Sequence, residues 1–426
     1  MNIVLFGAGS TGRGHLAALL YEEGFRNITF IERDAALADA LARARRYDVL
    51  YVGGGGSGGC EGGDGSGGGN GGGGGGGDGS GGGNSGVSGG GSSSGGGGGC
   101  IGGYDRKLTV AGFSAVRLDD SEGVSRAILS ADLVLTAVIA ENLQQVASAL
   151  APALSSRCKA GVANPVNIIC CENLNRASGL LKKQTAALLG AEALPWFEGS
   201  VGFPDCMISR VVPVYKDDPL TLVAEDYNEW VVDKKAVKGP VPPVSCIDFA
   251  DDLDAKLEKK LWVHNGGHAA VAYAGFLYGH EYVHEALKDG RVVSLGASAM
   301  DEIGNAVSHK HGYDRADVKR YEMNLVARGQ IEEMRDRIAR VVRNPIRKLG
   351  LDDRLLGPAL YCHAHGMPYG NIARSVLNVT KYFDPSDDES VRMKADIGRL
   401  GLRGFLSDTL GLAPYPEVVD TIINSQ

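Results

Sequence analysis

A lysine, an asparagine and a histidine stand close together in the segment KLWVHNGGH, which runs from Lys260 to His268. On a helix of about 3.6 residues per turn, Lys260, His268 and Asn265 fall at roughly 0°, 80° and 140°, so that one wall of a pocket can carry all three. A lysine held away from water has a lowered pKa and can act as general base toward a hydroxyl. Asn265 can donate to an oxygen that becomes a carbonyl, and His268 can bind a neighbouring hydroxyl. The set suits hydride transfer from an alcohol.

The same segment also has an interpretation without chemistry. Lys260 ends the charged run Glu258-Lys259-Lys260, and a charge run on a helix usually faces solvent. Gly266 and Gly267 weaken a helix by about 1 kcal/mol each. The segment alone does not exclude a solvated helix face, so the surrounding elements are needed to choose between the two interpretations.

Composition bounds the class of protein. The 426 residues are enough for two or more domains, and 43 Lys and Arg against 51 Asp and Glu give a net charge of -8, so nucleic acid is not an expected partner. The eight cysteines form no CxxC pair and no zinc-finger spacing with histidine, so we expect a reduced, cytosolic protein without a metal. No run of about 18 apolar residues occurs, and the chain starts directly with an apolar strand candidate; we therefore expect neither a membrane span nor secretion.

One segment departs from ordinary globular composition. Residues 53–103 hold 34 of the 64 glycines and contain no Lys, Arg or aromatic residue. Such a segment cannot bury enough apolar surface to offset its ordering entropy, so we predict a disordered insertion. Strand candidates at Arg45–Val52 and Leu108–Val110 flank it, which places the insertion at a surface turn. Cys60 and Cys100 lie within it, either as free thiols or as a bridge under oxidation.

The first residues predict a nucleotide-binding turn. Strand Ile3–Phe6 leads into Gly7-x-Gly9-x-x-Gly12, then into a helix through Tyr21 and a strand at Ile28–Ile31. In such a turn the first glycine permits the tight bend, the second lets the backbone approach a pyrophosphate and the third allows the helix to pack closely on the strand. The acidic residue after the second strand, Glu32, suits the ribose hydroxyls of NAD and disfavours the 2′-phosphate of NADP. The adjacent Arg33 can bind that 2′-phosphate, so NADP stays open as an alternative cofactor.

The rest of the chain predicts two domains. Helices around Glu122–Ser130 and Leu143–Leu154 alternate with strands at Asp132–Val138 and Asn167–Cys170, and a helix is expected to begin near Glu172. Alternating strands and helices indicate an α/β fold with a Rossmann-type doubly wound sheet. We expect the segment Ser200–Pro213 to be β-structured and Leu220–Trp230 to extend this sheet. The predicted domains are residues 1–250, which bind the nucleotide, and an all-helical substrate and catalytic domain at 251–426.

Several motifs together resemble one family, the polyol-specific long-chain dehydrogenases, over nearly the whole chain apart from residues 53–103. The motifs are FGAGSTGRG at Phe6–Gly14, TAV at Thr136–Val138, CENL at Cys171–Leu174, SVGF at Ser200–Phe203, an EW-VDK-like stretch at Glu229–Lys234, GHAAVAYAGFLYGH at Gly267–His280, NPIRKLG at Asn344–Gly350 and DRLLGP at Asp353–Pro358.

The resemblance implies a metal-independent dehydrogenase acting on a secondary hydroxyl. Its Lys-x4-Asn-x2-His pattern matches Lys260, Asn265 and His268, which makes Lys260 the general acid/base. The asparagine of CENL carries over to Asn173, which with Asn265 would hold the reacting oxygen; read from the residues alone, Asn173 could equally be a helix N-cap.

The resemblance also assigns the cofactor and substrate contacts. The expected cofactor is NAD, and the residues expected to contact it are Gly7, Gly9, Ser10, Thr11, Gly12, Arg13, Glu32, Thr136, Ala137 and Val138. For the phosphate of a sugar phosphate the candidates are Arg328, Arg347 and Lys348, each of which could instead be a surface or ion-pairing residue.

The expected substrate pair is D-mannitol 1-phosphate and D-fructose 6-phosphate, and the expected assembly is a monomer. An unphosphorylated polyol, a hexuronate, or a catalytically silent dinucleotide-binding protein stay open as alternatives. Two departures from the family pattern bear on the substrate: Ser209 stands where the family often has an acid, and an Arg-Phe-x-Asn-Pro stretch appears only as Arg328-Gly329-Gln330.

Overall fold

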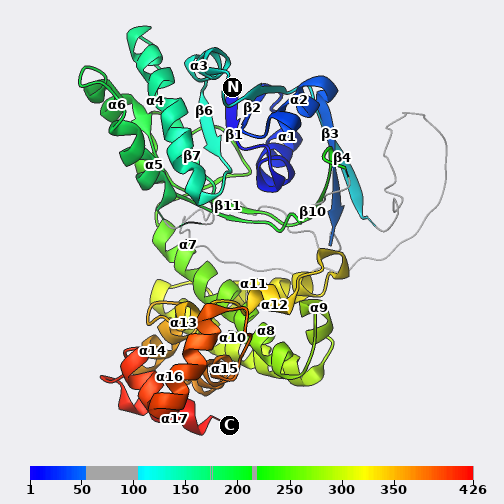
Figure 1. Cartoon of the computed structure of the whole chain (residues 1–426), viewed down its shortest axis with the longest axis vertical. Helices are drawn as coiled ribbons and strands as arrows, with labels where there is room; N and C mark the ends of the chain where they lie inside the picture. The colour runs from blue at the N-terminus through cyan, green and yellow to red at the C-terminus, as the bar shows by residue number, and fades with distance from the viewer. Residues whose placement is uncertain (54–103, 173, 175, 214–217, 426) are drawn as a thin grey trace, which may run out of the picture.

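The computed structural model describes residues 1–53, 104–172, 174, 176–213 and 218–425. Figure 1 shows the strands gathered in one part of the molecule, with the N-terminus, and the second half of the chain as a body of helices that ends at the C-terminus. Along the described chain the last strand ends at Ala250 and the first helix after it begins at Leu253.

Six parallel strands form the main sheet, in the order β5-β2-β1-β6-β7-β8. Their bounds are β1 Ile3–Phe6, β2 Ile28–Glu32, β5 Ser114–Arg117, β6 Leu133–Thr136, β7 Val166–Cys170 and β8 Val201–Gly202. The chain proceeds outward from β1 to one edge, returns to β6 and proceeds to the other edge. The predicted doubly wound, Rossmann-type sheet is therefore confirmed, and its strand order reverses between β1 and β6.

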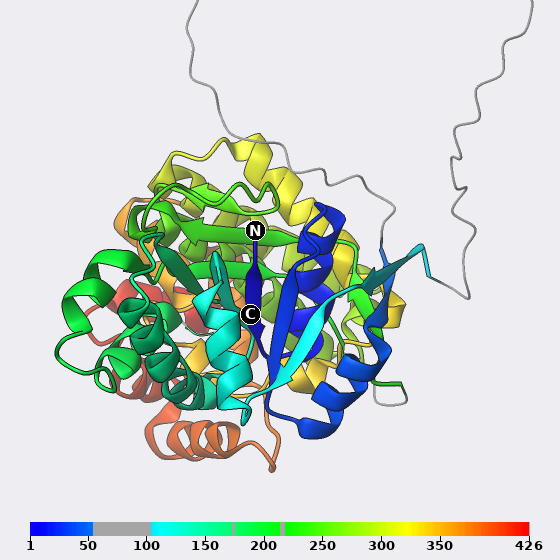
Figure 2. The same ribbon diagram turned by 90° about the horizontal axis from the view of Figure 1, so that it is seen from above.

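Both faces of this sheet are covered. In β1, Ile3 and Leu5 belong to one buried cluster and Val4 and Phe6 to another, because successive side chains of a strand point to opposite faces. Figure 2 shows helices on both sides of the strands. The first cluster includes side chains of η1 Gly12–Ala17, α1 Ala18–Glu22 and α2 Ala35–Ala44, and the second those of α3 Ser121–Leu129, α4 Leu143–Lys159, α5 Ala177–Ala186 and α6 Leu194–Ser200.

The remaining strands form two small sheets instead of extending the large one. One contains β10 Thr221–Glu225, β3 Arg46–Val52 and β4 Arg106–Ala111; the other contains β12 Asp248–Ala250, β11 Glu229–Asp233 and β9 Cys206–Ser209. The expectation that Leu220–Trp230 extends the main sheet is wrong, because β10 pairs with β3 and β11 pairs with β9. These pairings between distant segments are not visible in local sequence.

The strands on either side of the glycine-rich tract pair with each other. β3 and β4 run antiparallel from Arg46 opposite Ala111 to Tyr51 opposite Arg106. The chain therefore leaves β3 and re-enters β4 at the same end of a hairpin, as the flanking strand candidates predict. The prediction of disorder concerns residues 54–103, which lie outside the described residues.

The second half of the chain is helical. Its helices are α7 Leu253–Lys259, η4 Lys260–Gly266, α8 Gly267–Leu277, α9 Val283–Ala286, α10 Gly290–His311, α11 Arg315–Gly329, η5 Glu332–Met334, α12 Ile338–Val341, α13 Pro345–Lys348, α14 Leu356–Ala364, α15 Gly370–Thr380, α16 Asp388–Gly404, η6 Phe405–Thr409 and α17 Pro416–Asn424. Among the helices described, none combines the length and apolarity that a bilayer crossing needs.

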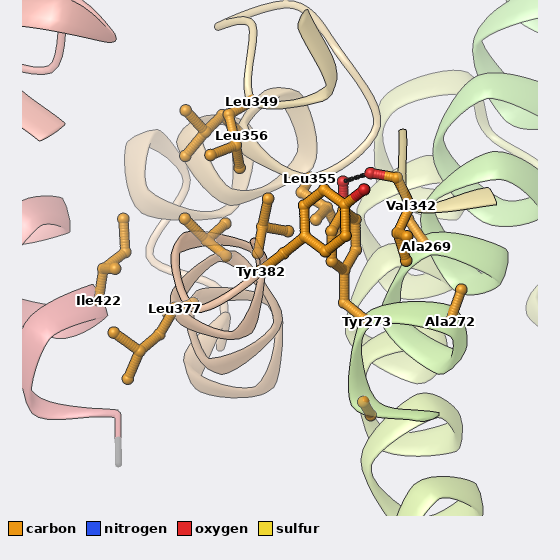
Figure 3. Close-up of a cluster of buried hydrophobic side chains, with 14 of the residues drawn as sticks. Ala269, Ala272, Tyr273, Val342, Leu349, Leu355, Leu356, Leu377, Tyr382 and Ile422 are labelled. Atoms are coloured by element: carbon orange, nitrogen blue, oxygen red, sulfur yellow. Dashed lines mark hydrogen bonds between the residues drawn. The ribbon is translucent and has the colours of Figure 1, made fainter. Parts of the chain in front are cut away.

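The core of this helical part forms around α8. Tyr273 lies against Tyr382 in an edge-to-face contact, and its hydroxyl donates to the carbonyl oxygen of Val342 at 2.7 Å (Figure 3). Leu355, Leu377 and other buried side chains complete the cluster. Because α8 directly follows η4, this packing fixes the position of the segment that carries the three candidate catalytic residues.

Candidate active site

The glycine turn after β1 has the geometry that a pyrophosphate cradle requires. Gly7 has φ +90°, and a Cβ there would lie 2.4 Å from the carbonyl oxygen of Ala137. A Cβ on Gly12 would lie 2.0 Å from the carbonyl oxygen of Gly7, whereas one on Gly9 would meet no atom of the described residues within 4 Å. The first and third glycines are thus enforced by close packing. The second faces open space where a phosphate can approach the backbone.

A pocket at the carboxyl ends of β1, β2 and β6 surrounds this turn. Gly7, Gly9, Glu32, Arg33, Ala137 and Val138 are among the residues that line this dinucleotide pocket. It lies where the strand order reverses, the usual ligand position in such sheets. The pocket brings together five of the predicted cofactor residues, and Ser10 and Thr11 follow directly at the start of the helical segment.

Glu32 and Arg33 both have partners at this pocket. The Glu32 carboxylate accepts hydrogen bonds from the backbone N–H of Ala8 at 2.6 Å and of Asp34 at 2.8 Å. Each carboxylate oxygen has a further lone pair that a ribose hydroxyl can use. Arg33 donates to the side-chain oxygen of Asn142 at 2.7 Å.

Arg13 and Thr136 do not face the dinucleotide pocket. Arg13 is buried, and its guanidinium donates to the carbonyl oxygens of Ala8 and Pro219, both at 2.5 Å. Thr136 is fully buried, and its hydroxyl donates to the carboxylate of Glu172 at 2.7 Å. These two side chains hold the turn and the strand end in place, and neither is among the residues that line the dinucleotide pocket.

Glu172 is a site residue that the sequence reasoning missed. Its carboxylate also accepts from the backbone N–H of Val138 at 3.0 Å, and it lines a second pocket together with Lys260. Burial raises its pKa, against the opposing effect of the Thr136 hydrogen bond. An acid two residues after a buried strand was the available signal. The helix expected to begin near Glu172 begins at Ala177. The Glu172 carboxylate is instead hydrogen-bonded to Thr136 and Val138 at the end of β6.

The segment that carries the candidate catalytic residues is largely a π-helix where an α-helix was expected. Lys260–Gly266 form η4, which continues α7 and runs into α8. Wider helical turns of this kind are frequent at functional sites. Lys260, Asn265 and His268 are all partly buried, which excludes the solvated helix face for this segment.

Lys260 has the environment of a lysine with a lowered pKa. Its ammonium donates to the carbonyl oxygen of Ile208 at 2.7 Å. Burial lowers its pKa, partly offset by the charge of Glu229. Glu229 lies directly opposite Ser209 in the pairing of β11 with β9, so an acid acts on the lysine although position 209 carries a serine.

Lys260 and Asn265 share one pocket, which we call the lysine pocket. Glu172, Cys206, Ile208 and Asp254 also line it. Gly266, next to Asn265, packs so closely that a Cβ would lie 2.5 Å from the carbonyl oxygen of Arg354. The glycine pair that weakens a helix in isolation is therefore needed for the packing of this one.

His268 lies in a second pocket, which we call the histidine pocket; its lining residue His264 directly precedes Asn265 of the lysine pocket. Its ring Nε2 is 3.1 Å from the carboxylate of Asp336. His264 lines the same pocket, and burial followed by the charge of Arg328 lowers its pKa well below the ordinary value. Among the described residues its buried Nδ1 has no hydrogen-bond partner.

Arg328 joins the two pockets electrostatically. It lines the histidine pocket, forms a bidentate pair with buried Glu225 and lies over the ring of Tyr227, and its charge also acts on Lys260. Its second terminal nitrogen, Nη1, is buried without a hydrogen-bond partner within the described chain. This nitrogen is therefore a donor whose hydrogen bond the described residues leave unmade.

The other two cation candidates lie elsewhere. Lys348 is buried, and its ammonium donates to the carbonyl oxygens of Val341 and Arg343. Arg347 is exposed beside it on α13. Neither is among the residues that line the lysine or histidine pocket. Asn173, the remaining predicted catalytic residue, lies outside the described residues.

The fold and site define a class: a Rossmann-type sheet with a dinucleotide pocket, followed by a helical domain that carries further pockets, is the arrangement of a nicotinamide-dependent dehydrogenase. Comparison with known families names it. The mannitol dehydrogenase Rossmann domain matches residues 102–245, and the mannitol dehydrogenase C-terminal domain matches residues 252–399. The chain belongs to the mannitol dehydrogenase family, and the expected enzyme class, a polyol dehydrogenase, is confirmed.

Relatives match over nearly their full length. The chain is 30% identical to a mannitol-1-phosphate 5-dehydrogenase of Brevibacillus brevis, over 100% of this chain and 97% of the relative. It is 27% identical to a mannitol-1-phosphate 5-dehydrogenase of Thermoanaerobacter pseudethanolicus, over 99% and 96% respectively.

Solved structures share the fold. A Pseudomonas fluorescens mannitol 2-dehydrogenase in ternary complex with NAD and D-mannitol aligns with a TM-score of 0.66 at 19% identity, covering 100% of this chain and 91% of that one. A substrate-free D-sorbitol dehydrogenase aligns with a TM-score of 0.73 at 16% identity, covering 99% and 92%.

Proposed function

We propose that this protein is an NAD-dependent mannitol-1-phosphate 5-dehydrogenase, which interconverts D-mannitol 1-phosphate and D-fructose 6-phosphate. The observation that carries the proposal is the pairing of two adjoining pockets. One holds a buried lysine beside Asn265, and the other holds an unpartnered guanidinium nitrogen of Arg328. The names of the two full-length relatives support the same substrate.

The chain's own residues perform the proton transfer. In polyol oxidation Lys260, as a neutral amine, takes the proton of the secondary hydroxyl; in the reverse reaction its ammonium returns that proton to the developing alkoxide. Burial lowers the pKa of Lys260 from its ordinary value, which favours the neutral amine that acts as the base. Asn265 donates to the same oxygen. Bound NAD supplies the hydride acceptor for the oxidation.

The glycine turn fits this cofactor. Open space in front of Gly9 admits the pyrophosphate, and Glu32 offers its remaining lone pairs to the ribose hydroxyls. The carboxylate of Glu32 lines the pocket at the position where NADP would carry a phosphate, and like charges there disfavour NADP.

The histidine pocket receives the other end of the substrate. Arg328 Nη1 donates to a phosphate oxygen, a charge-assisted bond that a hydroxyl of free fructose replaces only weakly. His268, held by Asp336, donates to or accepts from a hydroxyl between the two ends.

A substrate comparison tests the proposal. NADH oxidation is measured with fructose 6-phosphate, fructose and fructuronate at matched enzyme concentration. We expect kcat/KM to be highest for fructose 6-phosphate, by about a hundredfold or more over fructose, because charged hydrogen bonds contribute about 1.5–3 kcal/mol each. Equal or faster turnover of free fructose or fructuronate would contradict the phosphorylated substrate.

A further inference from the structure

Two cysteine side chains meet at the back of the lysine pocket. Cys171 directly follows β7, and Cys206 is the first residue of β9. The Cys206 thiol donates to the carbonyl oxygen of Cys170 at 3.1 Å, and its sulfur lies 3.7 Å from that of Cys171. A disulfide has a sulfur–sulfur distance of about 2.05 Å, so the two sulfurs are within a small side-chain movement of bonding.

The two thiols differ in accessibility. Cys206 is partly exposed and lines the lysine pocket, whereas Cys171 is 2% exposed. Cys206 lies close enough to Lys260 for their charges to interact, and its place in the pocket lining makes it the thiol that peroxide reaches first. Burial raises the pKa of the Cys171 thiol well above its ordinary value, so Cys171 reacts only after Cys206 has been oxidised.

We propose that Cys206 is an oxidation site inside the catalytic pocket and that Cys171 is its resolving partner, so that peroxide converts the pair into a disulfide that inactivates the enzyme reversibly. The inactivation rests on the proposed function, whereas formation of the bond does not.

The chemistry balances in two steps. The Cys206 thiolate attacks one oxygen of hydrogen peroxide, forms a sulfenic acid and releases hydroxide. The Cys171 thiol then attacks the Cys206 sulfur, and the sulfenic oxygen leaves as water with the thiol proton. Two thiols are oxidised by two electrons and one peroxide is reduced. A dithiol reductant reverses the bond by exchange.

The position of the bond explains the loss of activity. Cys206 lies two residues before Ile208, whose carbonyl oxygen accepts the hydrogen bond of Lys260. Drawing the Cys206 sulfur toward Cys171 strains the start of β9 and shifts this acceptor, because the two sulfurs, 3.7 Å apart, must approach by about 1.7 Å to bond. The lysine then loses the contact that holds its nitrogen in place.

The experiment treats the full-length protein with a small excess of hydrogen peroxide and measures two quantities. Peptide mass spectrometry under non-reducing conditions reads the bridges directly, and NADH oxidation with fructose 6-phosphate reads activity before and after dithiothreitol. We expect a Cys171–Cys206 peptide, together with an activity loss of about tenfold or more that the dithiol restores. A bridge between Cys60 and Cys100 has a different mass and does not count as support.

Three variants separate the proposal from general oxidation. In Cys206→Ser the ratio of oxidised to reduced activity, taken against the variant's own reduced rate, should stay near one. In Cys171→Ser no bridge forms, and dithiothreitol should no longer restore all of the lost activity, because the unresolved Cys206 sulfenic acid is oxidised further. Cys158→Ser, which removes a partly exposed thiol on α4, should behave like the unaltered chain. The proposal is overturned if oxidised native protein contains no Cys171–Cys206 peptide, or if Cys206→Ser is inactivated to the same extent.

Discussion

Lys260 is the residue on which the account depends, and its protonation state sets the direction of proton flow. Oxidation of the polyol needs the neutral amine, so kcat/KM should rise with pH up to the pKa of Lys260. Reduction of the ketose needs the ammonium and should fall through the same pKa. Because burial lowers this pKa from 10.5, both inflections should lie below 10.5. Measured pH–rate profiles in the two directions check this, and inflections at 10.5 or above would contradict the buried lysine.

Arg328 should determine the preference for a phosphate. Arg328→Lys retains the positive charge beside buried Glu225, and so avoids an unpaired carboxylate, but removes the Nη1 donor. We expect kcat/KM for fructose 6-phosphate to fall by about tenfold to a hundredfold, the equivalent of one charge-assisted hydrogen bond. For free fructose the rate should change little, and an equal loss with both substrates would place Arg328 away from the phosphate.

At the residue scale, the sequence shows which residues can do chemistry but not where their side chains point. Lys260, Asn265 and His268 were named from their spacing, and the structure places them around two adjoining pockets. Arg13 and Thr136 belong to the right motifs, but their side chains turn inward because buried carbonyls and the Glu172 carboxylate take their hydrogen bonds. His264 and Glu229 were missed, because their proximity to Lys260 depends on helix and strand packing that no local pattern records.

At the scale of elements, the large sheet was predictable and the small sheets were not. β1, β6 and β7 are continuous apolar runs of the kind that buried parallel strands require, and the glycine turn marks where the sheet begins. The pairing of β10 with β3, about 170 residues earlier, has no local signal. Nor does the π-helix at η4, since its widened turn follows from the packing of α7 and α8.

The glycine at the junction of η4 and α8 offers an element-scale test. In Gly266→Ala the new Cβ would press on the Arg354 carbonyl oxygen, which is backbone and cannot rotate away. We expect a loss of about 1–3 kcal/mol in unfolding free energy together with a lower kcat, because the segment that carries Lys260 must shift.

A matched substitution provides the control. Gly398→Ala, within α16, adds a Cβ that meets no described atom within 4 Å. It should stabilise the protein by up to about 1 kcal/mol without changing kcat. Denaturant unfolding and steady-state rates measure both effects, and a fully active, unshifted Gly266→Ala would show that the close packing at this junction is not required.

At the scale of the whole molecule, the hairpin of β3 and β4 makes the glycine-rich tract removable in principle. Replacing residues 54–103 with a short glycine–serine turn keeps Gly53, whose φ is +86°. We expect kcat/KM within about twofold of the full chain and an unfolding free energy higher by up to about 2 kcal/mol, the entropy of closing a loop ten times longer. A large loss of activity would show that the tract takes part in function.

A pair of neighbouring substitutions tests most directly whether Lys260 is the catalytic acid and base. Lys260→Met removes the proposed base, whereas Lys259→Met removes the adjacent ammonium, which lies 4.2 Å from the ring centre of Tyr321. Turnover of fructose 6-phosphate is measured for both, with NADH binding followed by fluorescence titration. The account predicts that Lys260→Met loses about a thousandfold or more in kcat while NADH binding is unchanged, and that Lys259→Met stays within about tenfold of the native rate. Native turnover by Lys260→Met would contradict it.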